Sequence, residues 1–326
     1  MVNRRQFISS SLGGFAAYAA GTFVPAWAQN APNLGTPVLP NPGFRRVKVG
    51  QVEVVSLLDG VSRRPLGEEF VANAPLAEVK ALLASQGLST DYVDVPYTPF
   101  LVVAGQRRIL MDTGLGDWGG PTTGKLLENL RAAGFGAEDI DTVLISHYHG
   151  DHINGLRNRA GEYVFRNATV MVPAGEHAYW MDETRAAQAT AGRMKGLFDN
   201  ARRTFGSMPA GMLQIFEPGS EVLPGITSVN AYGHTPGMTM FDVRSDGESF
   251  IFLADLTNIP ALFARNPDLA VAFDMDAEAA RQTRRMAFER IVANNAMVGG
   301  FHFPFPAVGH MVAVGAGYDF KPVAPA

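Results

Sequence analysis

Short runs of apolar residues, many of them alternating with polar ones and bounded by Gly, Pro or Asp, recur along this chain, and such a period-two pattern is typical of β-strands. Residues 47–49 and 52–55, joined by a Gly-containing turn, predict one hairpin, and residues 100–103 and 108–111 predict a second. Further strands are predicted at residues 140–146, 169–172, 214–216, 226–231, 238–245 and 250–254.

Apolar residues spaced three and four positions apart predict helices between the groups of strands. These helices cover residues 76–86, 124–133, 183–204 and 277–294. In the last of them Arg281, Arg284 and Arg285 fall opposite the apolar positions, so we expect all three arginines to face solvent. Strand groups that are each followed by a helix predict an α/β fold of two packed sheets covered by helices. No break in composition divides the chain, so we expect one domain.

The first 28 residues have the pattern of an export signal. Paired arginines at positions 4 and 5 precede a small-residue apolar stretch at residues 8–24, and residues 26–28 form an A-x-A cleavage pattern. The alternative is a short membrane anchor, but a stretch this rich in Gly and Ser is a poor match to ~30 Å of hydrocarbon. We therefore expect a twin-arginine-type signal peptide at residues 1–28, a domain at residues 29–326, a periplasmic or secreted location and no stable membrane insertion after processing.

Composition narrows the class of protein. The chain has 326 residues, 47% of them hydrophobic and 18% charged, which is typical of a globular enzyme rather than a disordered or fibrous protein. A net charge of -4 without a basic run argues against a nucleic-acid partner. The chain has no Cys, so any metal ligands must be His and carboxylate side chains.

The candidate chemistry is concentrated in the sequence H-Y-H-G-D-H at residues 147–152, which follows a predicted buried strand. Three of the seven histidines of the chain lie within these six positions, beside an Asp. An extended backbone directs His147 and His149 to the same side, where one metal ion can take both. A turn at Gly150 then lets Asp151 and His152 face a second metal ion.

Two metal ions need further ligands, and three candidates lie near the ends of predicted strands. His234 lies in the tight G-H-T-P-G turn, and His302 is surrounded by apolar residues late in the chain. Asp255 ends an apolar strand, where an unpaired buried carboxylate would be costly and one shared by two cations would be compensated. His177, by contrast, has no such setting, and we expect it to be structural.

The order of these motifs resembles the metallo-β-lactamase superfamily and thereby implies its αββα sandwich. The similarity extends from the D-T-G sequence at residues 112–114 to His302, and the tail at residues 305–310 adds a resemblance to methyl parathion hydrolase, the organophosphorus hydrolases and related lactonases. It implies two Zn²⁺ per chain. One ion is then held by His147, His149 and His234, the other by Asp151, His152 and His302, with Asp255 bridging both.

The resemblance also implies supporting residues around the metals. Asp112 corresponds to a buried Asp that supports the histidine loop, and for His310 a supporting role and a packing role remain equally open. Trp118, Trp180 and Phe273 are expected to line the substrate pocket, with residues 60–95 forming an arm near its mouth. No Arg or Lys lies in the two histidine motifs, which favours an apolar pocket for a neutral substrate.

These expectations define a metal-dependent hydrolase that cleaves neutral aryl phosphotriesters, aryl esters or aryl lactones with a hydroxide bridging the metals, and with Asp255 and Asp151 as its catalytic carboxylates. The main alternative is an acyl-homoserine lactonase or another esterase of the same fold. A β-lactamase is disfavoured because the familiar kinds use a Cys ligand. An enzyme similar to glyoxalase II or a phosphodiesterase, and a non-catalytic periplasmic metal or solute binder, are more remote alternatives, and homodimerisation remains open.

Overall fold

A computed structural model describes residues 34–324 of the chain. These residues form two seven-stranded sheets and a separate two-stranded sheet. The predicted signal peptide at residues 1–28 lies outside the described residues. Within residues 34–324, no helix combines the length and the apolar character that a bilayer span requires.

The first sheet contains both predicted hairpins and continues as a parallel sheet, in the order β1-β2-β5-β6-β7-β8-β9. Its strands are β1 (Phe44–Val49), β2 (Val52–Leu57), β5 (Phe100–Ala104), β6 (Arg107–Met111), β7 (Thr142–Leu144), β8 (Thr169–Pro173) and β9 (Leu213–Phe216). Parallel neighbours need crossover connections, and helices supply them. These helices are α3 (Leu126–Ala132), α4 (Gly150–Ile153), α5 (Ala174–Trp180), α6 (Glu183–Gln188) and α7 (Gly192–Phe205).

The second sheet runs in sequence order and is antiparallel except where β13 pairs with β14. Its strands are β10 (Glu221–Leu223), β11 (Ile226–Asn230), β12 (Thr239–Ser245), β13 (Glu248–Phe252), β14 (Met297–Gly299), β15 (Val308–Val314) and β16 (Gly317–Pro322). The parallel pair is joined through α8 (Pro260–Phe263) and α9 (Ala277–Ala293).

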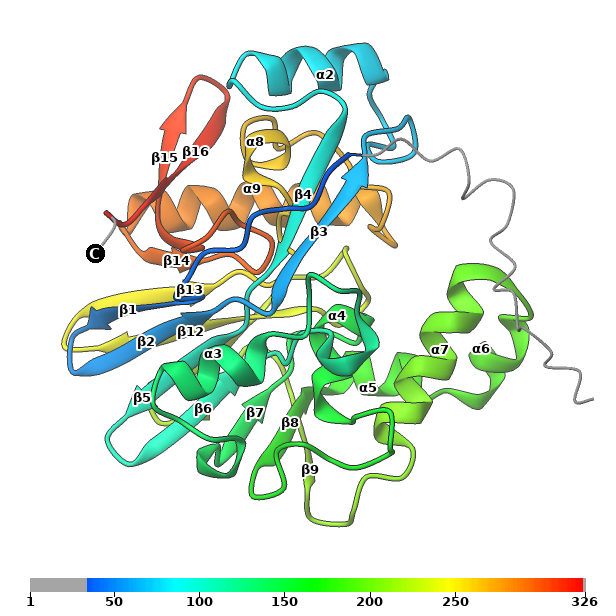
Figure 1. Cartoon of the computed structure of the whole chain (residues 1–326), viewed down its shortest axis with the longest axis vertical. Coiled ribbons are helices and arrows are strands. Elements are labelled where there is room, and N and C mark those ends of the chain that lie inside the picture. The colour runs from blue at the N-terminus through cyan, green and yellow to red at the C-terminus, as the bar shows by residue number, and fades with distance from the viewer. Residues whose placement is uncertain (1–33, 325–326) are drawn as a thin grey trace, which may run out of the picture. The chain divides into compact units, whose positions relative to one another are not determined.

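Successive side chains of the central strands point to opposite faces of the first sheet, and this alternation explains how the layers pack. Leu101 and Leu110 pack into a cluster with residues of α3, α5 and α7 on the outer side of the first sheet. Phe100, in contrast, packs with the second sheet, its ring centroid lying 5.4 Å from that of Phe250 and 5.6 Å from that of Phe252. Helix α9 covers part of the second sheet (Figure 1). The αββα sandwich is therefore confirmed.

The segment predicted as an arm forms the two-stranded sheet of β3 (Gly60–Pro65) and β4 (Tyr92–Tyr97), with α2 (Leu76–Ala84) between the strands. Figure 1 shows β3 and β4 as a pair apart from the first sheet. Three residues of this pair, Arg64, Val95 and Tyr97, line the cavity of the candidate site described below.

Two predictions about helices were wrong. The single helix expected at residues 183–204 is divided into α6 and α7, and the break ends at Gly192, whose φ of 69° lies in the left-handed region. Arg284, expected to face solvent, is only 1% exposed. The helical pattern placed it opposite the apolar stripe, but the loop of residues 256–274 covers that side of α9.

Candidate metal centre

The first histidine motif begins where β7 ends. Residues 145–149 belong to no strand or helix; His149 is extended, with φ and ψ of -66° and 151°, and α4 starts at the next residue. The change from extended to helical backbone directs Asp151 and His152 away from the side that His147 and His149 face. One short segment therefore supplies ligand atoms to two neighbouring positions.

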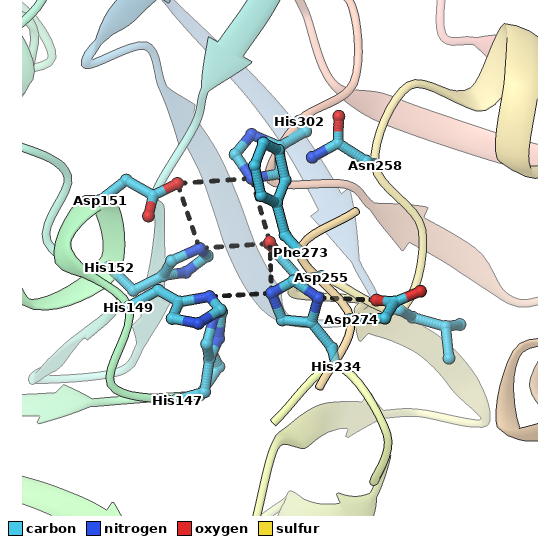
Figure 2. Close-up of polar contacts among 12 residues, drawn as sticks. His147, His149, Asp151, His152, His234, Asp255, Asn258, Phe273, Asp274 and His302 are labelled. Carbon is cyan, nitrogen blue, oxygen red and sulfur yellow. Dashed lines mark hydrogen bonds and ion pairs between the residues drawn. The ribbon is translucent and has the colours of Figure 1, made fainter. Parts of the chain in front are cut away.

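All seven predicted ligands come together, in two groups whose ligand atoms lie within 4.8 Å of one another (Figure 2). The first group is His147, His149, His234 and Asp255, and the second is Asp151, His152 and His302. The members from the second sheet follow β11, β13 and β14. The candidate centre therefore lies where strand ends of both sheets meet.

In four of the five candidate ligand histidines, the ring nitrogen that faces away from the centre already has a polar partner. Nδ1 of His147 lies 3.0 Å from Ser146 Oγ, that of His152 2.7 Å from Asp112 Oδ2, that of His234 2.9 Å from Asp274 Oδ1, and that of His302 2.7 Å from the Pro96 carbonyl. Such contacts fix a ring and its tautomer, leaving the Nε2 lone pair for a metal.

The atoms that face the centre lie against one another or lack a partner. Within the described residues, Nε2 of His147 is buried without a hydrogen-bond partner, and Nε2 of His152 faces carboxylate oxygens of Asp255 and Asp151 at 3.1 and 3.6 Å. His149 Nδ1 and His234 Nε2 face each other at 2.9 Å, an approach that needs a cation or a shared proton between the two nitrogens. Converging imidazole and carboxylate ligands with bonded outer atoms fit two divalent metal ions.

Asp255 lies between the two groups. Its Oδ2 is 3.1 Å from His234 Nε2 and 3.2 Å from His302 Nε2, and its Oδ1 is 3.1 Å from His152 Nε2. Burial would raise the pKa of the Asp255 carboxyl, but His302, His152 and His234 bring this pKa well below its usual range. Asp255 is thus ionised and in contact with members of both groups.

Asp112 holds the loop of the first histidine motif in place through contacts with Ser146 and His152. It is fully buried, accepts hydrogen bonds from the Ser146 backbone N–H (2.8 Å) and hydroxyl (2.7 Å), and contacts His152 Nδ1. Burial raises the pKa of Asp112, while His152 and Ser146 oppose the rise. Its φ of 59° is in the left-handed region, a conformation that a non-Gly residue adopts at a cost and that tertiary contacts here maintain.

A cavity of about 240 Å³ opens on the two groups. Phe273 lines it, as predicted, together with side chains of the arm and of α7. Its other lining residues are Arg64, Val95, Tyr97, Leu115, His149, Gly150, Asp151, Arg193, Leu197, His234, Asp255, Asn258 and His302. Burial, followed by the charge of Asp151, raises the pKa of Tyr97, so its hydroxyl stays protonated at neutral pH.

Several predicted residues lie elsewhere. Trp180 is fully buried and donates to Glu176 Oε2 (2.7 Å), packing beneath the histidine loop instead of lining the cavity. Trp118 is not among the lining residues either, because its indole donates to the Arg157 carbonyl (2.8 Å) and lies under Arg203. His310 lines a separate cavity of about 640 Å³ beside the β12–β13 turn, so of its two open roles the structure favours packing over support of the candidate metal ligands.

The sequence analysis missed two kinds of contributor. Asp274 and the Pro96 carbonyl hold ligand histidines from 40 and 206 residues away, and neither belongs to a motif. Arg64 and Arg193 line the cavity, so the expectation of a purely apolar wall is wrong. No local pattern marked these residues, although Asp274 lies just before the cap of the predicted helix α9.

The fold and these two ligand groups together define a metal-dependent hydrolase. The sequence profile of the metallo-beta-lactamase superfamily matches residues 93–294, and the chain belongs to this superfamily. A curated relative, N-acyl homoserine lactonase AiiB of Agrobacterium fabrum (strain C58), is 26% identical over 196 residues. That match spans 52% of this chain and 65% of the relative, which is less than two thirds of its length.

Two solved structures are similar over most of the chain. AidC, a dizinc quorum-quenching lactonase in complex with a product, has a TM-score of 0.79 and 27% identity, over 87% of this chain and 98% of that chain. AbOPH, a hydrolase of the beta lactamase superfamily, has a TM-score of 0.81 and 26% identity, over 89% and 100% respectively.

Proposed function

We propose that this protein is a dinuclear zinc lactonase, which hydrolyses the ring ester of small lactones. The observation that carries the proposal is the pair of ligand groups with Asp255 in contact with both, at the base of a cavity. The lactonase relatives support a lactone as substrate, and they favour this alternative over the aryl phosphotriesters that the sequence pattern led us to expect first.

In this proposal His147, His149 and His234 hold one zinc ion, Asp151, His152 and His302 hold the other, and Asp255 contributes to both. Two such ions supply Lewis acidity for a carbonyl oxygen and lower the pKa of the attacking water. Asp112, Asp274, Ser146 and the Pro96 carbonyl keep the ligand rings in place, so little reorganisation accompanies the reaction.

The residues of the cavity wall orient the substrate. The protonated hydroxyl of Tyr97 is available to donate a hydrogen bond to a bound carbonyl or ring oxygen. Asp151 lines the cavity with its side chain 24% exposed, so it is placed to hold the proton that passes to the departing alkoxide. Leu115, Leu197 and Phe273 provide apolar surface for the remainder of the substrate.

A rate panel on the zinc-loaded protein tests this function. The substrates are an acyl-homoserine lactone, an aryl lactone, a neutral aryl phosphotriester, a β-lactam and a phosphomonoester. We expect the highest kcat/KM with a lactone, and at least a hundredfold loss of that activity in Asp255→Ala. His177→Ala, whose ring bonds Tyr148 and does not line the cavity, is the control and stays within a few-fold. Faster hydrolysis of a β-lactam or the phosphotriester would contradict the proposal.

A further inference from the structure

Two arginines line the cavity of the candidate metal centre. Arg64 comes from β3 and Arg193 from the first turn of α7. Arg64 Nη2 donates to the Tyr97 hydroxyl at 3.4 Å, and Arg193 donates to the carbonyls of Ala272 and Phe273 at 3.5 Å each. These contacts are long and engage neutral acceptors only. Neither guanidinium forms an ion pair with a carboxylate of residues 34–324.

Two basic residues close to these arginines in the sequence are, in contrast, paired with carboxylates. Arg63, adjacent to Arg64, forms a two-pronged pair with Asp94 in which both N–O distances are 2.8 Å. Lys195, two residues after Arg193 on α7, pairs with Asp199. These two neighbours, which do not line the cavity, are each paired with a carboxylate, whereas Arg64 and Arg193 at its wall form no ion pair within residues 34–324.

The charge balance of the centre leaves these arginines in excess. Two divalent cations and the buried guanidinium of Arg284 would face only four carboxylates, those of Asp151 and Asp255 within the ligand groups and those of Asp112 and Asp274 behind them. The two guanidiniums then make the cavity cationic, and burial lowers the pKa of Arg193, an effect that the charges of Asp151 and Asp274 only partly offset. A guanidinium binds carboxylates through charge-assisted hydrogen bonds, which are stronger than neutral ones.

We propose that the preferred substrate is a compact lactone carrying a carboxylate outside its ring, with Arg64 and Arg193 binding that carboxylate while the ring ester lies at the metal centre. This inference rests on the proposed lactonase function. The cavity volume of about 240 Å³ is below the ~300–1,000 Å³ of sites for drug-sized ligands, which favours a small acidic lactone over one with a long acyl chain.

The reaction is a simple hydrolysis. Water adds to the ring carbonyl carbon, the bond between that carbon and the ring oxygen breaks, and the ring oxygen leaves as an alkoxide that takes up a proton. The new carboxylic acid ionises, so the product is a hydroxy dicarboxylate and one proton is released to solvent. No oxidant, reductant or second substrate is needed.

A matched substrate pair tests the inference. The probes are 5-oxotetrahydrofuran-2-carboxylate and its uncharged carboxamide, which share the ring and differ in the exocyclic charge. We expect zinc-loaded wild type to prefer the carboxylate at least tenfold in kcat/KM, mainly through KM. Arg64→Gln and Arg193→Gln should each lose about tenfold more kcat/KM on the carboxylate than on the carboxamide. Lys195→Gln removes a positive charge from the same helix outside the cavity, and it should match wild type on both probes.

Calorimetric binding of the product, 2-hydroxyglutarate, provides a second readout that does not depend on turnover. Its affinity should fall about tenfold in both arginine variants and remain unchanged in Lys195→Gln. Equal rates on the two probes, equal losses on both probes in the variants, or unchanged affinity for the product would overturn the inference. If neutral lactones are hydrolysed and neither probe is, the inference fails while the lactonase function stands. If no lactone of any kind is hydrolysed, the proposed function itself fails.

Discussion

The side chain behind a ligand histidine determines how firmly that histidine is presented to a metal. Asp274 is buried and its Oδ1 contacts His234 Nδ1 at 2.9 Å. Removing this partner frees the ring to rotate and to change tautomer. We therefore expect the loss of Asp274 to weaken metal binding more than it lowers the free energy of unfolding.

We predict that Asp274→Ala weakens binding of one metal ion by about 10–100-fold, the range typical of such outer contacts. Asp276→Ala is the control. Asp276 caps α9 through the Ala279 N–H, so its loss should cost about 1 kcal/mol of stability and leave metal affinity unchanged. Competition with a chromogenic chelator measures affinity and urea unfolding measures stability. Equal metal affinities in the two variants would show that Asp274 does not position His234.

Asp59 is a buried carboxyl away from the metal ligands. It accepts hydrogen bonds from the backbone N–H groups of Leu115 (2.9 Å), Leu126 (3.1 Å) and Gly124 (3.3 Å), and so joins β2 to the loop after β6. Burial raises the pKa of Asp59 from 3.8 to about 6, although these N–H groups oppose the rise. The folded state therefore holds this proton more tightly than the unfolded state does.

Because the folded protein holds the Asp59 proton more tightly, the free energy of unfolding is greater at low pH than at neutral pH. Stability from the protonated Asp59 is fully present below pH 4 and is lost as the pH rises through about 6, a change of about 3 kcal/mol. We predict that Asp59→Asn lacks this loss, so it gains stability relative to wild type between pH 4 and pH 7. Urea unfolding of both metal-free proteins at each pH measures the difference, and parallel pH curves would disprove the role of Asp59.

Among the elements, α9 is attached to the metal centre by Arg284. This guanidinium donates to the carbonyls of Leu256 (2.8 Å), Pro267 (3.0 Å) and Leu269 (2.7 Å), and lies 3.6 Å from Asp274 Oδ2. Leu256 directly follows Asp255, which contacts members of both candidate ligand groups. One buried side chain of a helix thus holds the loops that carry two residues of the site.

We predict that Arg284→Ala costs about 3–5 kcal/mol, because it leaves three carbonyls and a buried carboxylate without their partner. Arg285→Ala removes the next arginine, which pairs with Asp268 at the surface, and it should cost less than about 1 kcal/mol. Unfolding in urea compares the two. Similar losses in both variants would mean that the buried contacts of Arg284 contribute no more than a surface ion pair.

In the domain as a whole, the candidate metal ligands come from both sheets. Each ligand group combines residues that follow β7 in the first sheet with residues that follow strands of the second sheet. Metal ions bound there would cross-link the two halves of the sandwich. Binding to the folded state alone stabilises a protein by about 4 kcal/mol when the metal is at a thousand times its Kd.

We predict that a chelator abolishes activity and lowers Tm by about 10 °C, and that two equivalents of Zn²⁺ per chain restore both. Elemental analysis and thermal unfolding of the same samples check this. Full activity with one metal ion or none per chain would contradict a dinuclear centre.

The location of the protein rests on residues outside the described structure. We propose that residues 1–28 are removed during twin-arginine export, and we predict a mature N-terminus at Gln29. N-terminal sequencing of the periplasmic and culture fractions checks this. Intact Met1 confined to the cytosolic fraction would refute it.

Features that depend on neighbouring residues in the chain were predictable from the sequence. Alternating apolar residues around Gly-containing turns predicted both hairpins of the first sheet, because strand pairing across a short turn is decided locally. The H-x-H-x-D-H motif predicted a division between two ligand groups, since the backbone from His147 to His152 sets where each side chain points. The superfamily followed from the order of such motifs.

Features that depend on contacts between distant segments were decided only by the tertiary structure. The apolar side chain of Trp180 would suit the wall of a substrate pocket, but its neighbours bury it completely. Arg284 has the spacing of a solvent-facing residue in a helix, but a loop covers it. Arg64 and Arg193 meet at one cavity although 129 positions separate them. Periodicity reports which face of its own element a residue occupies, whereas the segment that packs against that face is set by the fold as a whole.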